Sequence, residues 1–363
     1  MTDIVLITGA SGMLGRHLLS RLCLSPQVER VMVLAHDQPQ EFTSSKIEVV
    51  KGDVKQEDFG LNLAARRAVG AKVSVIIHGA ALTSFSSQLE AARAVNVAGV
   101  ENLLSLAGHC RRLRAICHLS TIYVAGRRTG IIREDELSHG CGFVNAYEQS
   151  KYEAEQLLQA QAHELPVSIV RLSTVLGDSC DGAVNKLGAI HHALRFFFLS
   201  LAPFVPGRPE SLVDLISADY AAASVAACAL QDFLPRTWHV CGGADCLTLA
   251  ELLDITLQLF CTYRPSWRKR VIEKPAIVDL KTFELFVNSV ELLADSMLKD
   301  SVTILKHFAP QLAHPKQFED RTTVSLLEAA GVVRPSIRNY YSKVIQYLLE
   351  SNWQPAGCEQ TVA

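Results

Sequence analysis

The chain of 363 residues carries 35 Lys and Arg against 37 Asp and Glu, so its formal net charge is −2. This balance argues against a nucleic-acid-binding protein, which would usually present a strongly basic face. Hydrophobic residues make up 49% of the chain, which is enough apolar surface to offset the entropy lost on ordering. A folded globular protein is therefore expected.

The ten cysteines are scattered and form no CxxC pair, so neither a metal site nor a disulfide framework is predicted. No basic and then apolar leader precedes Ile4, and the cytoplasm is the expected location. No apolar stretch reaches the roughly 18 residues that a membrane span needs. The most apolar stretch, 196–205, is broken by Pro203. It predicts either the wall of an apolar substrate pocket or a patch in peripheral contact with a membrane.

Strands and helices alternate over the first half of the chain. A short β-branched strand at 4–7 leads through a glycine turn into an amphipathic helix. Further apolar runs predict strands at 31–34, 49–50, 73–77, 115–119 and 166–172, with helices near 87–109 and 147–163. Because each strand is almost wholly apolar, the pattern predicts an α/β fold with a Rossmann-type, doubly wound parallel sheet covered on both faces.

Past residue 176 the alternation fails. The segment 176–211 is rich in Gly and Pro and is expected to be irregular, and a strand, a helix and a strand return over 212–243. Helical periodicity then recurs near 247–262, 280–308 and 338–350. We expect residues 1–175, with the return segment 212–244, to form a dinucleotide-binding domain. Residues 176–211 and 245–353 would form a smaller, mostly helical substrate region, followed by a flexible tail at 354–363.

Three glycines lie between the first strand and the first helix, at Gly9, Gly12 and Gly15. Glycine permits positive φ and lets backbone N–H groups approach a pyrophosphate. The helix that follows directs the positive end of its dipole at the same place. The turn therefore predicts a dinucleotide site.

A tyrosine and a lysine four residues apart begin the helix near 147–163, as Tyr147 and Lys151. Positions i and i+4 share one helical face, so the ammonium is expected beside the phenol. A neighbouring positive charge lowers the pKa of a phenol and suits it to acid–base work. Ser120 and Thr121 end the preceding strand and offer a hydroxyl, although simple capping of the strand end explains either one.

These motifs resemble the extended short-chain dehydrogenases/reductases over about residues 3–245. The GxxGxxG spacing matches that family, as do Gly52-Asp53-Val54, the turn 78–81 (HGAA) and Asn96, where the family keeps a structural asparagine. The resemblance implies Thr121, Tyr147 and Lys151 as catalytic residues. It also implies cofactor contacts from Gly9, Ser11, Gly12, Met13, Leu14, Gly15, His36, Asp53, Val54, Ala80, Ala81, Asn96, Tyr147 and Lys151.

A narrower resemblance lies at 143–155, FVNAYEQSKYEAE. This segment is similar to one in fatty acyl-CoA reductases and in thioester-reductase domains of carboxylic acid reductases and peptide synthetases. The implied reaction transfers hydride from a nicotinamide to an acyl thioester on coenzyme A or a carrier protein. It yields an aldehyde, and a second hydride would give the alcohol, as in lipid metabolism. Thr121 and Tyr147 would hydrogen-bond the developing oxyanion, and Lys151 would hold the nicotinamide ribose and keep the tyrosine acidic.

The end of the second strand bears on the choice of cofactor. Enzymes selective for NAD place Asp or Glu there to bind the ribose hydroxyls, whereas this chain has Ala35. The resembled reductases have an arginine near the place of His36. Histidine is only partly charged at neutral pH, and Asp37 beside it opposes a 2′-phosphate. NADPH is expected in preference to NADH.

Two other functions fit the same motifs. One is a ketone or hydroxysteroid dehydrogenase or a nucleotide-sugar epimerase of the extended family. An epimerase needs basic residues for a sugar diphosphate, and the segment 176–211 holds only Lys186, Arg195 and Arg208. The other is a non-catalytic cofactor sensor or scaffold. Such proteins often lose the tyrosine or the lysine, and this chain keeps both.

Overall fold

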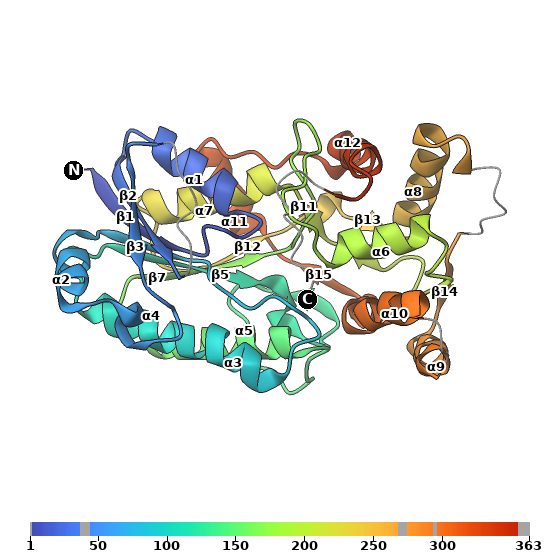
Figure 1. Cartoon of the computed structure of the whole chain (residues 1–363), viewed down its shortest axis with the longest axis horizontal. Coiled ribbons are helices and arrows are strands. Elements are labelled where there is room, and N and C mark those ends of the chain that lie inside the picture. Colours follow the sequence, from blue (N-terminus) through green and yellow to red (C-terminus); the bar gives the residue numbers. More distant parts are fainter. Residues whose placement is uncertain (1, 37–43, 268–273, 293–295, 355–363) are drawn as a thin grey trace.

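The structure is a computed structural model that describes residues 2–36, 44–267, 274–292 and 296–354. A seven-stranded parallel sheet of order β12-β7-β5-β4-β1-β2-β3 forms its centre (Figure 1). Its strands are β1 (Asp3–Thr8), β2 (Val28–Ala35), β3 (Ile47–Lys51), β4 (Val75–His78), β5 (Ala115–Thr121), β7 (Val167–Leu172) and β12 (Thr237–Val240). The predicted Rossmann-type sheet is confirmed.

The apolar runs form central strands because both faces of the sheet are covered. Every residue of β1, β4 and β7 is buried. Strand order runs outward from β1 to β2 and β3, and the chain then crosses back to place β4 on the other side of β1. Such a switch point leaves a crevice at the carboxyl ends of the strands, where ligands of doubly wound sheets bind.

Helices cover both faces of this sheet (Figure 1). On one face α1 (Gly15–Leu24), α7 (Ala218–Leu230) and α11 (Arg321–Ala329) share a core that includes Leu18, Val225 and Leu327. On the other face α2 (Leu63–Lys72), α4 (Ala98–Gly108) and α5 (Ala146–Ala160) share a second core, and α3 (Leu89–Asn96) lies along α5. The layered packing fixes both the glycine turn and the start of α5 at one edge of the sheet.

The rest of the chain lies beyond that edge. A further core joins α6 (Ala189–Phe198), α8 (Leu249–Tyr263) and α12 (Ile337–Glu350), and α9 (Leu280–Glu291) packs with α10 (Ser296–Phe308) and α6 in another. Short strands pair as β8 (Thr174–Val175) with β11 (Leu215–Ile216), β9 (Phe204–Pro206) with β14 (Ala276–Val278), β10 (Leu212–Val213) with β13 (Leu247–Thr248), and β6 (Gly130–Ile132) with β15 (Lys316–Phe318). Single 3-10 turns are η1 (Glu57–Gly60), η2 (Ile122–Ala125), η3 (Gly243–Asp245) and η5 (Ala309–Ala313).

The expected irregular segment 176–211 contains a ten-residue helix, α6, and that part of the prediction is wrong. The helix stands because Ile190, Leu194 and Phe197 form an apolar stripe that packs in the core with α8 and α12. The helix expected near 87–109 is two helices, which meet at Val97. The domain boundaries proposed above stay a prediction. The segment 354–363, expected to be a flexible tail, lies outside the described residues apart from Gln354.

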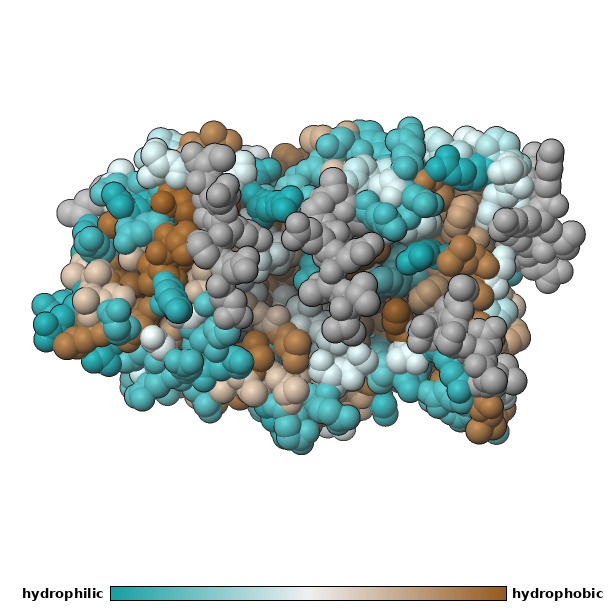
Figure 2. Space-filling view, in the orientation of Figure 1, coloured by the Kyte–Doolittle hydropathy of each residue, from teal (hydrophilic) through white to brown (hydrophobic). Residues whose placement is uncertain are grey.

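Within the described residues, no helix has the length and apolar character needed to cross a bilayer. On the face shown in Figure 2 the hydrophobic residues form separate groups between hydrophilic ones. In the stretch 196–205, Phe196 and Phe197 are 8% and 3% exposed and pack in two hydrophobic cores, while Leu199 is 41% exposed. Phe196 and Phe197 are therefore packed in the interior of the protein.

Candidate functional site

The glycine turn is folded tightly against the loop that follows β4. Gly12 N donates to Gly9 O at 3.0 Å, and Gly15 N donates to Gly12 O at 3.0 Å. Gly9 has φ +77°, and a Cβ there would lie 2.5 Å from the carbonyl carbon of Gly79. A Cβ on Gly15 would overlap the Ala10 carbonyl oxygen. Only glycine fits these two positions, so the turn brings backbone close to the carboxyl ends of β1 and β4.

The start of α1 is suited to an anion. Among the described residues of its first turn there is no acidic side chain, and Leu14 at the N-cap makes no side-chain hydrogen bond. The predicted contact residues Ser11, Gly12, Met13 and Leu14 are exposed or half-buried. A pocket opens beside them, lined by Met13, His17, Val175, Leu176, Gly177, Ala183, Val184, Asn185 and Ala218. The residues present therefore fit the pyrophosphate of a dinucleotide.

Side chains hold the loop after β4, which contains Ala80 and Ala81, at both of its ends. Thr8 Oγ1 accepts from Ala80 N at 3.1 Å and lies 3.0 Å from His78 Nδ1. At the other end, Asn96 Oδ1 accepts from Leu82 N at 2.8 Å, and Asn96 Nδ2 donates to Leu82 O at 3.1 Å. Asn96 is 1% exposed, and its amide also donates to Ser150 Oγ on α5 at 2.8 Å. It thus supports both the loop and α5, and it lies in the interior rather than on the surface of the crevice.

Three of the predicted cofactor contacts, His36, Asp53 and Val54, lie together after the ends of β2 and β3. His36 Nε2 is 3.1 Å from Asp53 Oδ2, and Lys55 Nζ is 3.7 Å from the same oxygen. Asp53 Oδ1 accepts from Lys55 N at 2.9 Å. Val54 follows, and its carbonyl accepts from Asn102 Nδ2 at 2.9 Å. Asp37 lies outside the described residues.

Thr121 and Tyr147 meet at the end of β5. Thr121 is the last residue of that strand and Tyr147 lies in the first turn of α5, where Asn145 caps the helix by accepting from Glu148 N at 3.0 Å. Burial raises the pKa of Tyr147 to about 12, and the Glu148 carboxylate adds to the rise, while the nearby Thr121 hydroxyl acts to lower it. The phenol therefore stays protonated at neutral pH and is ready to donate.

Lys151 lies one turn further along α5, and its ammonium is directed at β5. Lys151 Nζ donates to Leu119 O at 2.7 Å and lies 2.9 Å from His118 Nε2, and the lysine is 1% exposed. Burial lowers the pKa of Lys151 to about 8. The expectation that Lys151 keeps Tyr147 acidic is wrong for this structure. The two side chains share a helical face, but the ammonium is held at the strand and burial dominates the phenol.

Ser120, the neighbour of Thr121, serves the interior. Its hydroxyl donates to Glu155 Oε1 at 2.5 Å, and Glu155 pairs with Arg171 at 2.8 Å. The Arg171 and Glu155 side chains are 1% and 0% exposed. The guanidinium also donates to Glu136 O at 2.9 Å. Because side chains alternate along a strand, the two adjacent hydroxyls point to opposite faces of β5.

Aromatic side chains outside the predicted set surround Tyr147. The Phe85 ring lies 5.4 Å from the Tyr147 ring, and the Phe308 ring stacks 6.1 Å beyond Phe85. Phe85 comes from the loop before α3 and Phe308 ends α10. These two residues therefore supply apolar surface beside the tyrosine.

Further partners of the site carried no sequence signal. Gln311 contacts the beginning of α5 from 163 residues away, Lys316 donates to Gln311, and no local pattern marks either residue. Glu148 lies inside the Tyr147–Lys151 motif but reads there as an ordinary acid of a helix's first turn. Its burial, at 1% exposed, appears only in the folded chain.

The fold and the site define an α/β dinucleotide-binding protein with a threonine and a tyrosine at the carboxyl edge of the sheet. Residues 35–225, more than half of the chain, match the model of an NAD-binding family described as "Male sterility protein". The chain belongs to this family.

Two curated relatives are multidomain synthetases. The "PKS-NRPS hybrid synthetase cheA" of Chaetomium globosum is 30% identical over 243 residues, 61% of this chain and 5% of that protein. The "Polyketide synthase-nonribosomal peptide synthetase ACE1" of Pyricularia oryzae is 31% identical over 336 residues, 87% of this chain and 8% of that protein. The chain thus spans less than a tenth of the length of either relative.

Solved structures agree in fold. The terminal R domain from the myxalamid PKS-NRPS pathway superposes with TM-score 0.79 at 24% identity, over 97% of this chain and 92% of that one. A thiolation-reductase di-domain from an archaeal non-ribosomal peptide synthetase gives TM-score 0.73 at 22% identity, over 97% and 76%. The predicted resemblance and fold class are confirmed.

Proposed function

We propose that this protein is an NADPH-dependent reductase that converts an acyl thioester, held on a carrier protein or on coenzyme A, to an aldehyde. The observation that carries the proposal is the Thr121–Tyr147 hydroxyl pair at the switch-point edge, beside a turn that fits a pyrophosphate. The named functions of the relatives, which are synthetases and terminal reductase domains, support thioesters as the substrate class. The thiolation-reductase di-domain favours a carrier protein as the donor of the acyl chain.

The proposed chemistry assigns one role to each side chain. A bound reduced nicotinamide supplies hydride to the thioester carbonyl carbon. Thr121 donates a hydrogen bond to the carbonyl oxygen, and Tyr147 donates its proton there as negative charge develops. Collapse of the resulting hemithioacetal breaks the carbon–sulfur bond and releases a thiol and an aldehyde. Phe85 and Phe308 give the acyl chain an apolar surface beside the reacting carbon.

The test compares substrates and one variant. Consumption of NADPH is measured with acyl-coenzyme A, acyl-pantetheine and a ketosteroid, formation of aldehyde with the two thioesters, and epimerisation with a UDP-sugar. We expect turnover of the two thioesters, and we expect Tyr147→Phe to lower it by about 100-fold or more, since only the proton donor is removed. Affinity for NADPH should stay nearly unchanged. Preferred turnover of the ketosteroid or the UDP-sugar, or a Tyr147→Phe variant with more than about a tenth of the rate, would overturn the proposal.

The preference for NADPH is proposed from the end of β2. Ala35 stands where an acid would bind both ribose hydroxyls, and the side chains of His36 and Lys55 lie around Asp53. Dissociation constants for NADPH and NADH at pH 7 decide the matter. We expect tighter NADPH binding, and His36→Ala should weaken NADPH binding without affecting NADH. Equal or tighter binding of NADH by the wild type would contradict the preference.

A further inference from the structure

The first turn of the catalytic helix contains a buried carboxylate next to Tyr147. Glu148 Oε2 accepts from Val144 N at 3.0 Å, and Glu148 Oε1 accepts from Asn145 Nδ2 at 3.2 Å. Both partners precede the helix, so Glu148 ties the chain entering α5 to its first turn. The third donor to this carboxylate comes from far away in the sequence.

That donor is Gln311 in η5, which is itself buried. Gln311 Nε2 donates to Glu148 Oε1 at 2.5 Å, and Gln311 Oε1 accepts from Lys316 Nζ at 2.7 Å. Lys316 Nζ also donates to the Gly126 carbonyl at 2.6 Å. Gly126 ends η2, the turn that begins directly after Thr121. An unbroken series of hydrogen bonds therefore joins the helix of Tyr147 to the turn of Thr121.

Neighbouring contacts strengthen the same connection. Asn145 Nδ2, at the N-cap of α5, donates to the His307 carbonyl at the end of α10 at 3.0 Å. Strand β15, which begins with Lys316, pairs in parallel with β6 just beyond Gly126. The segment 307–318 thus contacts both chain segments that carry the catalytic hydroxyls, and it belongs to neither.

A buried ionisable network costs free energy that an apolar cluster of the same size would not, because each charge leaves water. Burial raises the pKa of Glu148 to about 7 and lowers the pKa of Lys316 to about 8. Simple packing gives no reason to keep an acid, an amide and an amine in line here. Holding two catalytic groups at a fixed separation does give one, since a misplacement of about 1 Å can cost 100-fold in rate.

We infer that Glu148, Gln311 and Lys316 are positioning residues, which form a bridge that holds Tyr147 and Thr121 in register for the reductase reaction proposed above. The inference rests on that proposed function. The bridge requires a Glu148 carboxylate as acceptor and a Lys316 ammonium as donor. Segment 307–318 is then part of the catalytic apparatus although it touches neither cofactor site nor tyrosine hydroxyl.

Ionisation of the bridge sets a pH window. Glu148 becomes a carboxylate as pH rises through about 7, and Lys316 loses its proton as pH rises through about 8. The ionisable groups that act on these two are Tyr147 on α5, Tyr123 in η2, Arg127 and Arg128 after η2, Cys141 in the loop before α5, and His314 before β15. Since the arginines stay charged throughout, kcat is expected to fall on the acid side as Glu148 takes up a proton and on the alkaline side as Lys316 loses one.

The test uses kcat profiles from pH 6 to 9 with a thioester substrate and NADPH. Glu148→Gln should lower kcat at least about 10-fold at pH 7.5 and remove the acid limb, with little change in KM for NADPH. Lys316→Met should lower kcat similarly, and Lys316→Arg should restore most of it. Glu153→Gln on the same helix, whose carboxylate pairs with Arg93 at the surface, is the matched control and should match the wild type.

A second readout does not depend on activity. Gln311→Leu keeps a side chain of similar size and breaks the series in the middle. Amide hydrogen exchange should then speed up in both 122–126 and 145–150, and Glu153→Gln should change neither. This variant also decides the case if Glu148→Gln does not fold. A wild type that reduces no thioester contradicts the proposed function. The bridge is overturned if the wild type reduces thioesters while Glu148→Gln has the same pH profile of kcat and Gln311→Leu has the same amide exchange rates as the wild type.

Discussion

Adjacent residues at the end of β5 have separate tasks. The Thr121 hydroxyl meets the phenol of Tyr147, whereas the Ser120 hydroxyl donates to Glu155 in a buried cluster with Arg171. A strand turns successive side chains to opposite faces, so a shift of one residue would place the Ser120 hydroxyl beside Tyr147 and the Thr121 hydroxyl in the buried cluster.

This division of roles predicts different effects of two substitutions. Thr121→Val should lower kcat with a thioester by about 100-fold, the usual cost of one lost hydrogen-bond donor to an oxyanion. It should also lower the free energy of unfolding by about 1 kcal/mol, because Thr121 Oγ1 caps η2 by accepting from Tyr123 N at 3.2 Å. Ser120→Ala should leave kcat near that of the wild type and lower the free energy of unfolding by about 1–3 kcal/mol, because a Glu155 oxygen loses a partner. Turnover assays and urea unfolding measure both. The assignment fails if Ser120→Ala is the slower enzyme.

Spacing alone was enough to predict that Thr121 and Tyr147 come together at the end of β5, because a strand end, a glycine turn and a YxxxK helix are local patterns. The surroundings of Lys151 were beyond such reasoning. His118 faces Lys151 because β4 and β5 align His78 with His118, and both imidazoles are buried. Burial lowers the pKa of both histidines, so they surround the ammonium as neutral groups. That environment depends on strand register, which no single segment encodes.

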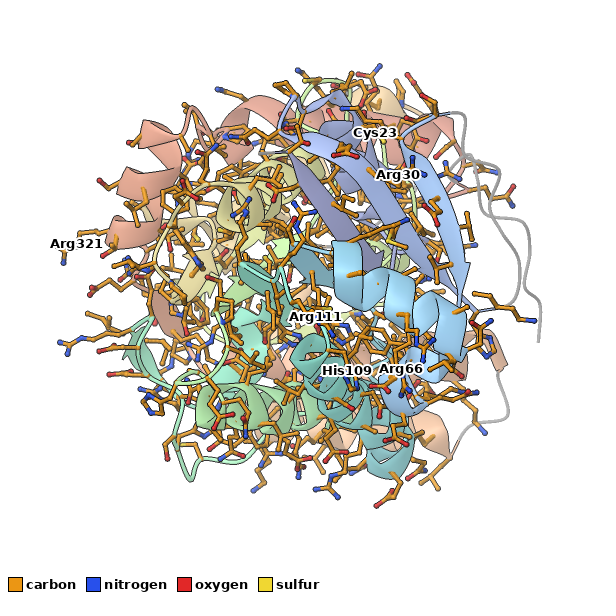
Figure 3. The ribbon with its side chains drawn as sticks, turned by 90° about the vertical axis from the view of Figure 1, so that its left-hand side faces the viewer. Cys23, Arg30, Arg66, His109, Arg111 and Arg321 are labelled. Atoms are coloured by element: carbon orange, nitrogen blue, oxygen red, sulfur yellow. The ribbon has the colours of Figure 1, made fainter. Side chains whose placement is uncertain are left out.

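Among the elements, the turn η1 supports the cofactor edge from below. Asp58 and Phe59 both have positive φ, at 49° and 59°. The Phe59 ring stacks on the His78 ring with 5.8 Å between their centroids, and the Phe59 backbone carbonyl accepts from Asp53 N at 2.8 Å. Asp58 anchors the turn by accepting from Arg66 Nη1 on α2 at 2.6 Å and from Ser105 Oγ on α4 at 2.9 Å. Arg66 lies next to His109, the C-cap residue of α4, on the side of the molecule shown in Figure 3.

The anchor gives the stability a pH dependence. Although burial alone would raise it, the hydrogen bonds from Arg66 and Ser105 and the nearby positive charges hold the pKa of Asp58 below its ordinary 3.8. A lowered pKa contributes stability above the unfolded value that is lost as pH falls through the folded one. Asp58→Asn should cost about 2 kcal/mol at pH 7 and flatten the acid side of the stability curve.

Asn accepts positive φ as readily as Asp, so this variant tests charge and hydrogen bonding rather than backbone strain. The measurement is the free energy of unfolding from pH 3 to 7. Glu57→Gln, at the exposed neighbouring position, is the control and should follow the wild type. Equal curves for wild type and Asp58→Asn would show that Asp58 is no anchor.

Central strands were predictable as elements because burial on both faces leaves an apolar run. Besides α6, two helices were not. Of α2 only Val69 and Gly70 are buried, so its apolar stripe is too short to stand out. Helix α11 buries Thr323 and Leu327 against the first core and likewise shows a weak stripe. Helices that are stabilised by tertiary contacts rather than by their own periodicity escape sequence reasoning.

At the scale of the whole molecule, the C-terminal hundred residues pack against two different hydrophobic cores. Helix α11 packs on the nucleotide-binding sheet, and α12, which follows it, fills the core shared with α6 and α8. Arg334 lies between them and donates to the Cys241 carbonyl at 2.9 Å, next to β12. The C-terminal segment therefore packs against both the central sheet and the core shared by α6, α8 and α12, here called the outer core. The sheet and the outer core are expected to unfold together.

This coupling predicts the effect of a single cavity in α12. Leu348 is 0% exposed in the outer core, and Leu348→Ala should lower the free energy of unfolding by about 2–5 kcal/mol. The whole transition should move as one step when it is followed by tryptophan fluorescence and by far-ultraviolet circular dichroism. Glu350→Ala at the exposed end of the same helix should leave the transition in place. Separate transitions in the two signals would show that the outer core unfolds independently.

The long sequence separation between Glu148 and its partners also has a consequence for folding during synthesis on the ribosome. Gln311 follows Glu148 by 163 residues, and Lys316 follows Gly126 by 190. At roughly 5–20 residues per second, synthesis leaves a delay of about 10–30 s between the catalytic helix and the segment that completes it. During that interval the nucleotide-binding sheet is nearly finished while the Glu148 carboxylate remains in water. The nascent chain is thus expected to bind cofactor before it can reduce anything.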